Sequence, residues 1–78
     1  MKIVVYTKSG CPNCVTAKAL LKFKGLEYVE HDIEKYPATF GVMLAEYPSA
    51  RQMPQIFIDN QRVGGLAGLQ AALKQAGL

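Results

Sequence analysis

The chain is poor in the residues that build metal sites. Its 78 residues include only two cysteines, Cys11 and Cys14, and a single histidine, His31. A structural zinc site takes about four ligands, usually two cysteine pairs or one pair with histidines. We therefore expect no metal site, and we interpret His31 as a satisfied histidine at the surface or at the edge of the core.

The sequence also lacks long apolar runs and clustered charge. No apolar run approaches the roughly 20 residues that a membrane span needs, and residues 1–4 show neither the apolar region nor the cleavage site of a signal peptide. The net charge is +3, with lysines and arginines spread along the chain. We expect no role at membranes or on nucleic acids, and a reducing cytoplasm is the expected compartment.

No internal repeat, linker or low-complexity segment divides the sequence. A chain of this length with 50% hydrophobic residues can form one core. We therefore expect a single domain that spans residues 1–78 and acts as a monomer.

The most informative stretch is residues 9–14, where two thiols stand three positions apart between an apolar run and a helical pattern. With Cys11 as N-cap, Pro12 suits the first helical position because its φ is fixed and it has no N–H. The Cys11 sulfur then lies beside unpaired N–H groups at the positive end of the helix dipole. Such placement lowers the pKa of a cysteine from about 8.5 to roughly 3.5–7.5.

Cys14, one turn inside the helix, is expected to be more buried and to keep its proton longer. We interpret Cys11 as the nucleophile and Cys14 as the resolving thiol of a pair that cycles between dithiol and disulfide. An inert structural disulfide is disfavoured, because the stabilisation from a cross-link grows with loop length and this loop is very short.

The hydrophobic pattern predicts four strands and three helices in the order βαβαββα. The run at 2–7 fits a central strand buried on both faces. Gly25 suits a left-handed C-cap, and Asp59-Asn60 suits a hairpin turn. The predicted strands are 2–7, 26–33, 55–58 and 61–64, and the predicted helices are 15–24, 34–47 and a closing helix after Gly64-Gly65.

This order predicts an α/β fold with a mixed four-stranded sheet and helices on both faces. The first two strands should be parallel and joined by a right-handed crossover helix. The closing hairpin adds an antiparallel edge. The cysteine turn then lies at the carboxyl end of the first strand, where open α/β sheets usually carry their sites.

With these elements placed, the chain resembles the glutaredoxins of the thioredoxin-like superfamily. The likeness runs nearly end to end, and it is carried by Cys11-Pro12-Asn13-Cys14, Met53-Pro54-Gln55-Ile56-Phe57-Ile58, Val63-Gly64-Gly65 and a short closing helix. The resemblance implies a thioredoxin-like fold and thiol–disulfide exchange. It also implies that Pro54 is a cis-proline beside the cysteines, which leaves the Met53 backbone free to pair with a thiol peptide.

The resemblance further implies that glutathione is the co-substrate, with no metal or tightly bound organic cofactor. Lys8 matches the basic residue that pairs with the glycine carboxylate, and Arg51 is expected to add a second positive contact. Gly65, with the N–H groups of Leu66 and Ala67, matches the helix start that holds the γ-glutamyl carboxylate. The expected groove consists of Lys8, Pro12, Asn13, Arg51, Met53, Pro54, Gly65, Leu66 and Ala67.

Two positions depart from the family pattern. Asn13 stands where many glutaredoxins have tyrosine, which removes an aromatic wall of the groove. Gly68 stands where an acidic residue usually holds the α-ammonium of glutathione. Loss of such a charge-assisted contact removes about 1.5–3 kcal/mol, or roughly ten- to a hundredfold in affinity. On this interpretation, Gly68→Asp should tighten glutathione binding.

Four functions stay open at this point, one of them a non-catalytic thioredoxin-like binding module in which the pKa of Cys11 would lie near the ordinary value for cysteine. The other three involve redox or iron–sulfur chemistry. The first is a glutathione-dependent oxidoreductase that reduces glutathione mixed disulfides or protein disulfides, such as that of ribonucleotide reductase; Lys8 favours it. The second is a glutaredoxin-like redoxin that is reduced by thioredoxin reductase and donates electrons to ribonucleotide reductase; the missing acid at Gly68 favours it. The third is an iron–sulfur carrier in which two chains share a cluster through Cys11 and two glutathiones; Pro12 and Cys14 argue against it.

Overall fold

The computed structural model describes residues 1–78 and confirms the predicted order of elements. The hairpin strands have the predicted bounds, whereas the second strand and second helix are shorter than predicted. None of the helices has the length and apolar content that a membrane crossing requires. The elements are β1 (Ile3–Thr7), α1 (Pro12–Phe23), β2 (Val29–Asp32), α2 (Pro37–Glu46), β3 (Gln55–Ile58), β4 (Gln61–Gly64) and α3 (Leu66–Gln75).

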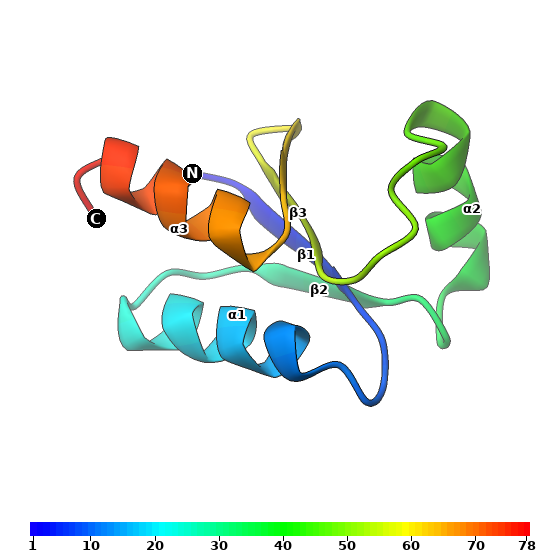
Figure 1. Cartoon of the computed structure of the whole chain (residues 1–78), viewed down its shortest axis with the longest axis horizontal. Coiled ribbons are helices and arrows are strands. Elements are labelled where there is room, and N and C mark those ends of the chain that lie inside the picture. The colour runs from blue at the N-terminus through cyan, green and yellow to red at the C-terminus, as the bar shows by residue number, and fades with distance from the viewer.

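The four strands form one mixed sheet in the order β2-β1-β3-β4 (Figure 1). β1 pairs with β2 in parallel and with β3 antiparallel, and β4 pairs antiparallel with β3. α1 and α3 lie against each other and cover one face of the sheet, while α2 lies apart from them (Figure 1). This thioredoxin-like arrangement buries one main apolar cluster of Ile3, Val5, Ala17, Leu21, Ile56, Leu69 and Leu73.

β1 is the central strand that the apolar run predicts, but only one of its faces is fully buried. Ile3 and Val5 are 2% and 0% exposed beneath the two covering helices. Val4 and Tyr6, on the opposite face, are only half-buried. The prediction of burial on both faces is therefore wrong for the second face. The reason is that α2 is short and buries only Met43 completely.

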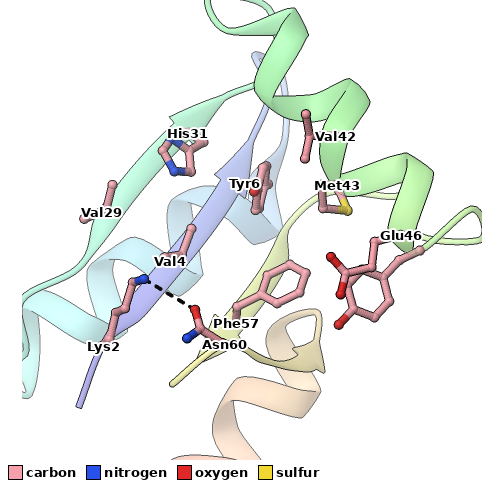
Figure 2. Close-up of a pocket in the computed structure, with 11 residues that line it drawn as sticks. Lys2, Val4, Tyr6, Val29, His31, Val42, Met43, Glu46, Phe57 and Asn60 are labelled. Atoms are coloured by element: carbon pink, nitrogen blue, oxygen red, sulfur yellow. Dashed lines mark hydrogen bonds between the residues drawn. The ribbon is translucent and has the colours of Figure 1, made fainter.

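The uncovered part of this second face forms a hollow of about 460 Å³ beside α2 (Figure 2). Tyr6, His31 and Phe57 line it from three neighbouring strands, and Met43 lines it from the helix. The ring of His31 lies 5.2 Å from that of Tyr6, which confirms a histidine at the edge of the core. Burial raises the pKa of the Tyr6 hydroxyl.

Local signals mark the ends of the regular elements as predicted. Asp59 and Asn60 have φ values of 50° and 68° in the hairpin turn between β3 and β4. Positive φ at both central residues is the geometry of a tight hairpin turn that asparagine and aspartate tolerate. Gly25, with φ of 68°, directly follows the C-cap Lys24 of α1 and supplies the left-handed end that the sequence predicts.

Gly68 lies in the first turn of α3, where the helix passes very close to the end of β4. A Cβ at this position would lie 1.8 Å from the carbonyl oxygen of Val63 and 2.8 Å from its carbonyl carbon. Both atoms belong to the backbone, so no side-chain rotation relieves the overlap. The position cannot accept aspartate without moving α3, and the proposal that Gly68→Asp tightens glutathione binding loses its structural basis. Helix-to-strand packing accounts for this glycine.

We predict that Gly68→Ala destabilises the fold by about 1–3 kcal/mol, the usual cost of overpacking a close contact. Gly41→Ala is the matched control, because a Cβ on this α2 residue meets nothing within 4 Å. Gly41→Ala should raise the free energy of unfolding by about 0.5–1 kcal/mol, because glycine is unfavourable in the interior of a helix. Urea unfolding followed by circular dichroism measures both. Equal stabilities of Gly68→Ala and the parent would refute the close approach.

Candidate active site

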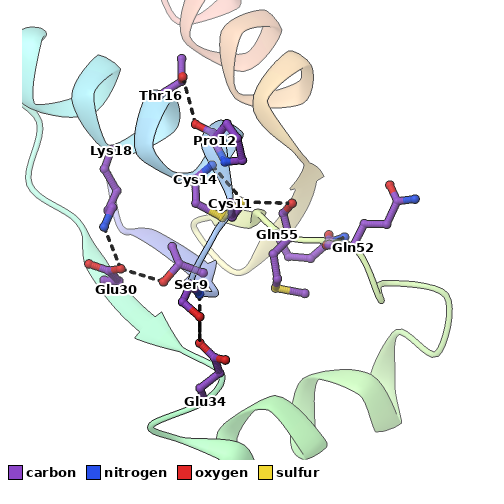
Figure 3. Close-up of a disulfide and its surroundings, with 12 residues drawn as sticks. Ser9, Cys11, Pro12, Cys14, Thr16, Lys18, Glu30, Glu34, Gln52 and Gln55 are labelled. Atoms are coloured by element: carbon purple, nitrogen blue, oxygen red, sulfur yellow. Dashed lines mark hydrogen bonds and ion pairs between the residues drawn. A yellow bond between two sulfur atoms is a disulfide. The ribbon is translucent and has the colours of Figure 1, made fainter.

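Cys11 and Cys14 are joined by a disulfide at the start of α1 (Figure 3). Their Cα atoms are 5.2 Å apart. Cys11 is the N-cap and Pro12 is the first helical residue, as predicted. The Cys14 N–H donates to the Cys11 carbonyl oxygen and to the Cys11 sulfur, each at 3.1 Å. The first turn of the helix thus directs a backbone donor at the Cys11 Sγ, which favours negative charge on that sulfur.

The two cysteines differ in burial in the predicted direction. Cys11 is 8% exposed and Cys14 is 2% exposed. Pro12 and Asn13, which lie between them, are both exposed. An incoming disulfide therefore meets Cys11 before Cys14, and the exposed turn offers it a flank that carries no bulky side chain.

The Met53-Pro54 segment packs directly against the reactive turn. The peptide bond between these residues is cis, as the resemblance implies. The Met53 carbonyl oxygen lies 3.4 Å from the Cys11 sulfur. The Met53 N–H has no hydrogen-bond partner in the chain, although the residue is only 8% exposed. An unpaired backbone donor next to a nucleophilic sulfur is suited to bind an extended substrate chain.

The start of α3 adjoins the same segment. Gly65 is the N-cap of α3, and a Cβ on it would lie 3.6 Å from the Pro54 carbonyl oxygen. The N–H groups of Leu66, Ala67 and Gly68 have no acceptor in the chain. Unpaired N–H groups at a helix start attract anions. The structure therefore brings the cysteine turn, the cis-proline segment and an anion-attracting helix start to one edge of the sheet.

The two positively charged residues predicted to contact glutathione are not held in place by other side chains. Lys8 is exposed in the turn before Cys11, and Arg51 is exposed in the segment before Met53. Neither side chain makes a hydrogen bond or an ion pair within the chain. Both charges are thus available to an anionic ligand, and their contact with glutathione stays a prediction.

Glu34 is a neighbour of the cysteine turn that the sequence interpretation missed. Its carboxylate accepts hydrogen bonds from the Ser9 N–H at 2.9 Å and the Ser9 hydroxyl at 2.6 Å (Figure 3). These bonds lower the pKa of Glu34, and the charge of Lys8 lowers it further. The sequence contained a signal for this contact. Glu34 follows β2, which runs parallel to β1, and the carboxyl ends of neighbouring parallel strands lie at the same edge of the sheet. The charge of Glu34 opposes the attraction of Lys8 for anions.

A second polar network fixes the end of β1 beneath the turn. Thr7, the last residue of β1, is 2% exposed, and its hydroxyl donates to the Glu30 carboxylate at 2.7 Å. The Lys18 ammonium donates to the same oxygen at 3.0 Å (Figure 3). The hydrogen bond from Thr7, and to a lesser extent that from Lys18, lowers the pKa of Glu30. The network ties β1, β2 and the cysteine-bearing helix together.

A mixed sheet whose central strand leads into a CxxC helix start, with a cis-proline against the first sulfur, defines the thioredoxin-like thiol–disulfide oxidoreductases. Within this class, the glutaredoxin family model matches residues 3–63 of the chain. The chain therefore belongs to the glutaredoxin family, and its enzymatic class is thiol–disulfide oxidoreductase.

Individual relatives agree with this assignment. A probable glutaredoxin of Synechocystis sp. is 44% identical over 70 residues, which cover 90% of this chain and 80% of that protein. Glutaredoxin 3 of Escherichia coli is 40% identical over 76 residues, which cover 97% and 90% of the two chains. The structure of reduced Escherichia coli glutaredoxin superposes with a TM-score of 0.77 at 32% identity, covering 96% of this chain and 95% of that one.

We predict that Glu30 makes the stability of the fold sensitive to acid. Its pKa in the folded protein lies below the ordinary 4.5, so the unfolded chain binds this proton more tightly. The contribution of Glu30 is therefore present above roughly pH 4.5 and is lost as the pH falls through the lower, folded pKa. Glu30→Gln should lower the free energy of unfolding at neutral pH by roughly 1 kcal/mol and flatten its decrease toward pH 3.

Urea unfolding at several pH values measures this difference. Glu27→Gln is the matched control, because Glu27 is exposed and makes no ion pair. The same pH dependence in both variants would show that the network does not contribute to stability.

Proposed function

We propose that this chain is a glutathione-dependent thiol–disulfide oxidoreductase, with Cys11 as the nucleophile and Cys14 as the resolving thiol. The observation that carries the proposal is the setting of the Cys11 sulfur. It accepts the Cys14 N–H at 3.1 Å, lies 3.4 Å from the Met53 carbonyl and caps α1. In the reduced protein the Cys14 N–H and the helix start favour the thiolate, which is the attacking species in disulfide exchange.

The first reaction path reduces glutathione mixed disulfides and uses Cys11 alone. The Cys11 thiolate attacks the glutathione sulfur of the substrate, the substrate S–S bond breaks, and the released thiolate takes a proton from water. A glutathione thiolate then attacks the glutathione sulfur bound to Cys11. This step returns the Cys11 thiolate and yields oxidised glutathione, so one substrate disulfide is exchanged for one glutathione disulfide.

The second path reduces protein disulfides and uses both thiols. The Cys11 thiolate forms a mixed disulfide with one substrate sulfur and releases the other as a thiolate. Cys14 then loses its proton and attacks the Cys11 sulfur, which releases the reduced substrate and leaves the Cys11–Cys14 disulfide of this structure. Two glutathione molecules restore the dithiol and leave as oxidised glutathione.

In the proposed groove, glutathione lies along the edge of the sheet where the cysteine turn, the cis-proline segment and the start of α3 meet. The backbone of its cysteine pairs with Met53, and the γ-glutamyl carboxylate binds the N–H groups of Leu66 and Ala67. The glycine carboxylate faces Lys8. Arg51 adds a second positive charge, Pro12 and Asn13 form the exposed flank, and Gly65 and Pro54 form the floor between the two ends.

The partners follow from this chemistry. Disulfide-containing proteins such as oxidised ribonucleotide reductase are the proposed substrates of the two-thiol path. Reduced glutathione is needed in excess to restore the dithiol, so we place the protein in the cytoplasm. We propose that it acts as a monomer.

A second candidate is a redoxin that thioredoxin reductase reduces in place of glutathione. The first turn of α3 contains no acidic residue, and Gly68 has no room for one. The α-ammonium of glutathione therefore finds no carboxylate there. Glu34, bonded to Ser9 beside Lys8, weakens the attraction for the glycine carboxylate as well. These two features favour the alternative reductant.

We predict that the two cysteines have separable roles. Cys11→Ser should abolish all exchange, because no thiolate remains at the helix start. Cys14→Ser should keep at least half of the rate with a glutathionylated peptide and lose reduction of a protein disulfide such as that of insulin. Initial rates with the two substrates give the comparison. Retention of protein-disulfide reduction by Cys14→Ser, or of either activity by Cys11→Ser, would contradict the assigned roles.

We also predict which reductant sustains turnover. With NADPH and bis(2-hydroxyethyl) disulfide, glutathione plus glutathione reductase should support NADPH oxidation at least tenfold faster than thioredoxin reductase. The decrease in absorbance of NADPH measures both rates, and Cys11→Ser supplies the blank. Faster turnover with thioredoxin reductase would establish the second candidate and reject glutathione as the physiological reductant.

A further inference from the structure

Gln55 is a buried polar residue that neither reaction path uses. It is the first residue of β3, directly after Pro54, and it is 5% exposed. Its side-chain amide donates from Nε2 to the Gln52 carbonyl oxygen at 2.8 Å and accepts at Oε1 from the Arg62 Nε at 3.0 Å. Figure 3 includes Gln52 and Gln55 among the surroundings of the disulfide. A buried amide satisfied at both ends holds its two partners in fixed positions.

The Gln52 carbonyl belongs to the same peptide group as the Met53 N–H. The cis bond of this segment follows Met53, so the Gln52–Met53 peptide is trans, and its C=O and N–H point in opposite directions. The bond from Gln55 to the carbonyl therefore also fixes the direction of the N–H. The Met53 N–H has no partner in the chain, and the carbonyl oxygen of Met53 lies 3.4 Å from the Cys11 sulfur.

Arg62 determines the orientation of the Gln55 side-chain amide. A guanidinium can only donate, so it selects the amide oxygen and leaves the amide NH₂ for the Gln52 carbonyl. Arg62 lies on β4, and its guanidinium also lies over the Tyr47 ring, 5.9 Å from the ring centroid. Tyr47 is the C-cap of α2, where the segment that leads to Met53 begins. Arg62 thus contacts the start of this segment directly and its end through Gln55.

We propose that Gln55 is a positioning residue for the exchange reaction. Acting through the Gln52–Met53 peptide, and oriented by Arg62, it aims the Met53 N–H at a backbone carbonyl of the incoming disulfide. The inference rests on the proposed function, because it needs a substrate that approaches Cys11. It assigns a substrate class to the position: disulfides whose sulfur is carried by a peptide gain from this donor, and disulfides without a peptide backbone do not.

Gln55→Met tests the proposal, because methionine has a similar length but neither donates nor accepts a strong hydrogen bond. The pre-reduced protein, without free glutathione, is mixed with a glutathionylated peptide or with bis(2-hydroxyethyl) disulfide. Acid quenching and mass spectrometry follow its oxidation. The second-order rate constant for the peptide should fall about tenfold, the effect of one misplaced hydrogen bond. The rate with bis(2-hydroxyethyl) disulfide should change less than twofold.

Gln61→Met is the matched control, on the strand that carries Arg62. It changes an exposed glutamine side chain that has no role in the proposed contacts, so both rate constants should equal those of the parent. Arg62→Met, an exposed position, should show the same selective loss as Gln55→Met. The double variant should lose no more than Gln55→Met alone, because both residues act through one peptide group. Arg62→Met also keeps the proposal testable if Gln55→Met does not fold.

The outcomes separate this proposal from the proposed function. A selective loss with the peptide substrate supports the positioning role. Equal slowing with both disulfides, or no slowing with either, in a folded Gln55→Met or Arg62→Met variant overturns it, because a purely structural amide would not distinguish the substrates. A parent protein that neither disulfide oxidises overturns the proposed function itself.

Discussion

The placement of one sulfur at the start of one helix is the constraint on which the structure depends. Cys11 caps α1, and the Cys14 N–H reaches its sulfur at 3.1 Å. The geometry holds only if the helix axis and the end of β1 are both fixed. Ala17 and Leu21, each 0% exposed, fix the axis against the sheet. The hydrophobic core thus holds a backbone N–H against the sulfur, and an exposed pair of cysteines on a flexible loop would have no such donor.

The buried polar side chains of the protein lie at the edge of the sheet that carries the Cys11 sulfur. Thr7 and Gln55 are the buried polar residues. They end β1 and begin β3, which are paired antiparallel strands, and so lie at the same edge. Burying a polar group is costly unless it is hydrogen-bonded, and both are satisfied, Thr7 by Glu30 and Gln55 by two partners. An apolar core would stabilise the fold equally well but would not orient the backbone around the cysteines.

The sequence predicts features that depend on neighbours along the chain and misses those that depend on packing. The Cys11 cap, the Asp59-Asn60 turn and the order of helices and strands along the chain all follow from local residue types and spacing, and the structure confirms them. Gly68 is an example of the second group. Its residue type suggests a lost contact with a ligand. The position requires glycine because the Val63 carbonyl, five positions earlier and on another element, leaves no room for a Cβ. Glu34 was also missed: the parallel pairing of β1 and β2, which the sequence predicts, brings the ends of these strands together, but the hydrogen bond from Ser9 to the Glu34 carboxylate depends on how the chain continues after β2.

In the proposed groove, the choice between glutathione and another reductant depends on a balance between backbone donors and side-chain charge. Neutral backbone hydrogen bonds contribute about 0.5–1.5 kcal/mol each, and charge-assisted bonds about 1.5–3 kcal/mol. The Met53 N–H is a donor of the first kind, whereas the unpaired N–H groups at residues 66–68 form bonds of the second kind with a carboxylate. Charged side chains add little, because α3 begins without an acid and Glu34 partly offsets the charge of Lys8. The proposed groove therefore favours an extended peptide disulfide that places a carboxylate at the start of α3, and α3 offers no acidic partner to the α-ammonium of glutathione.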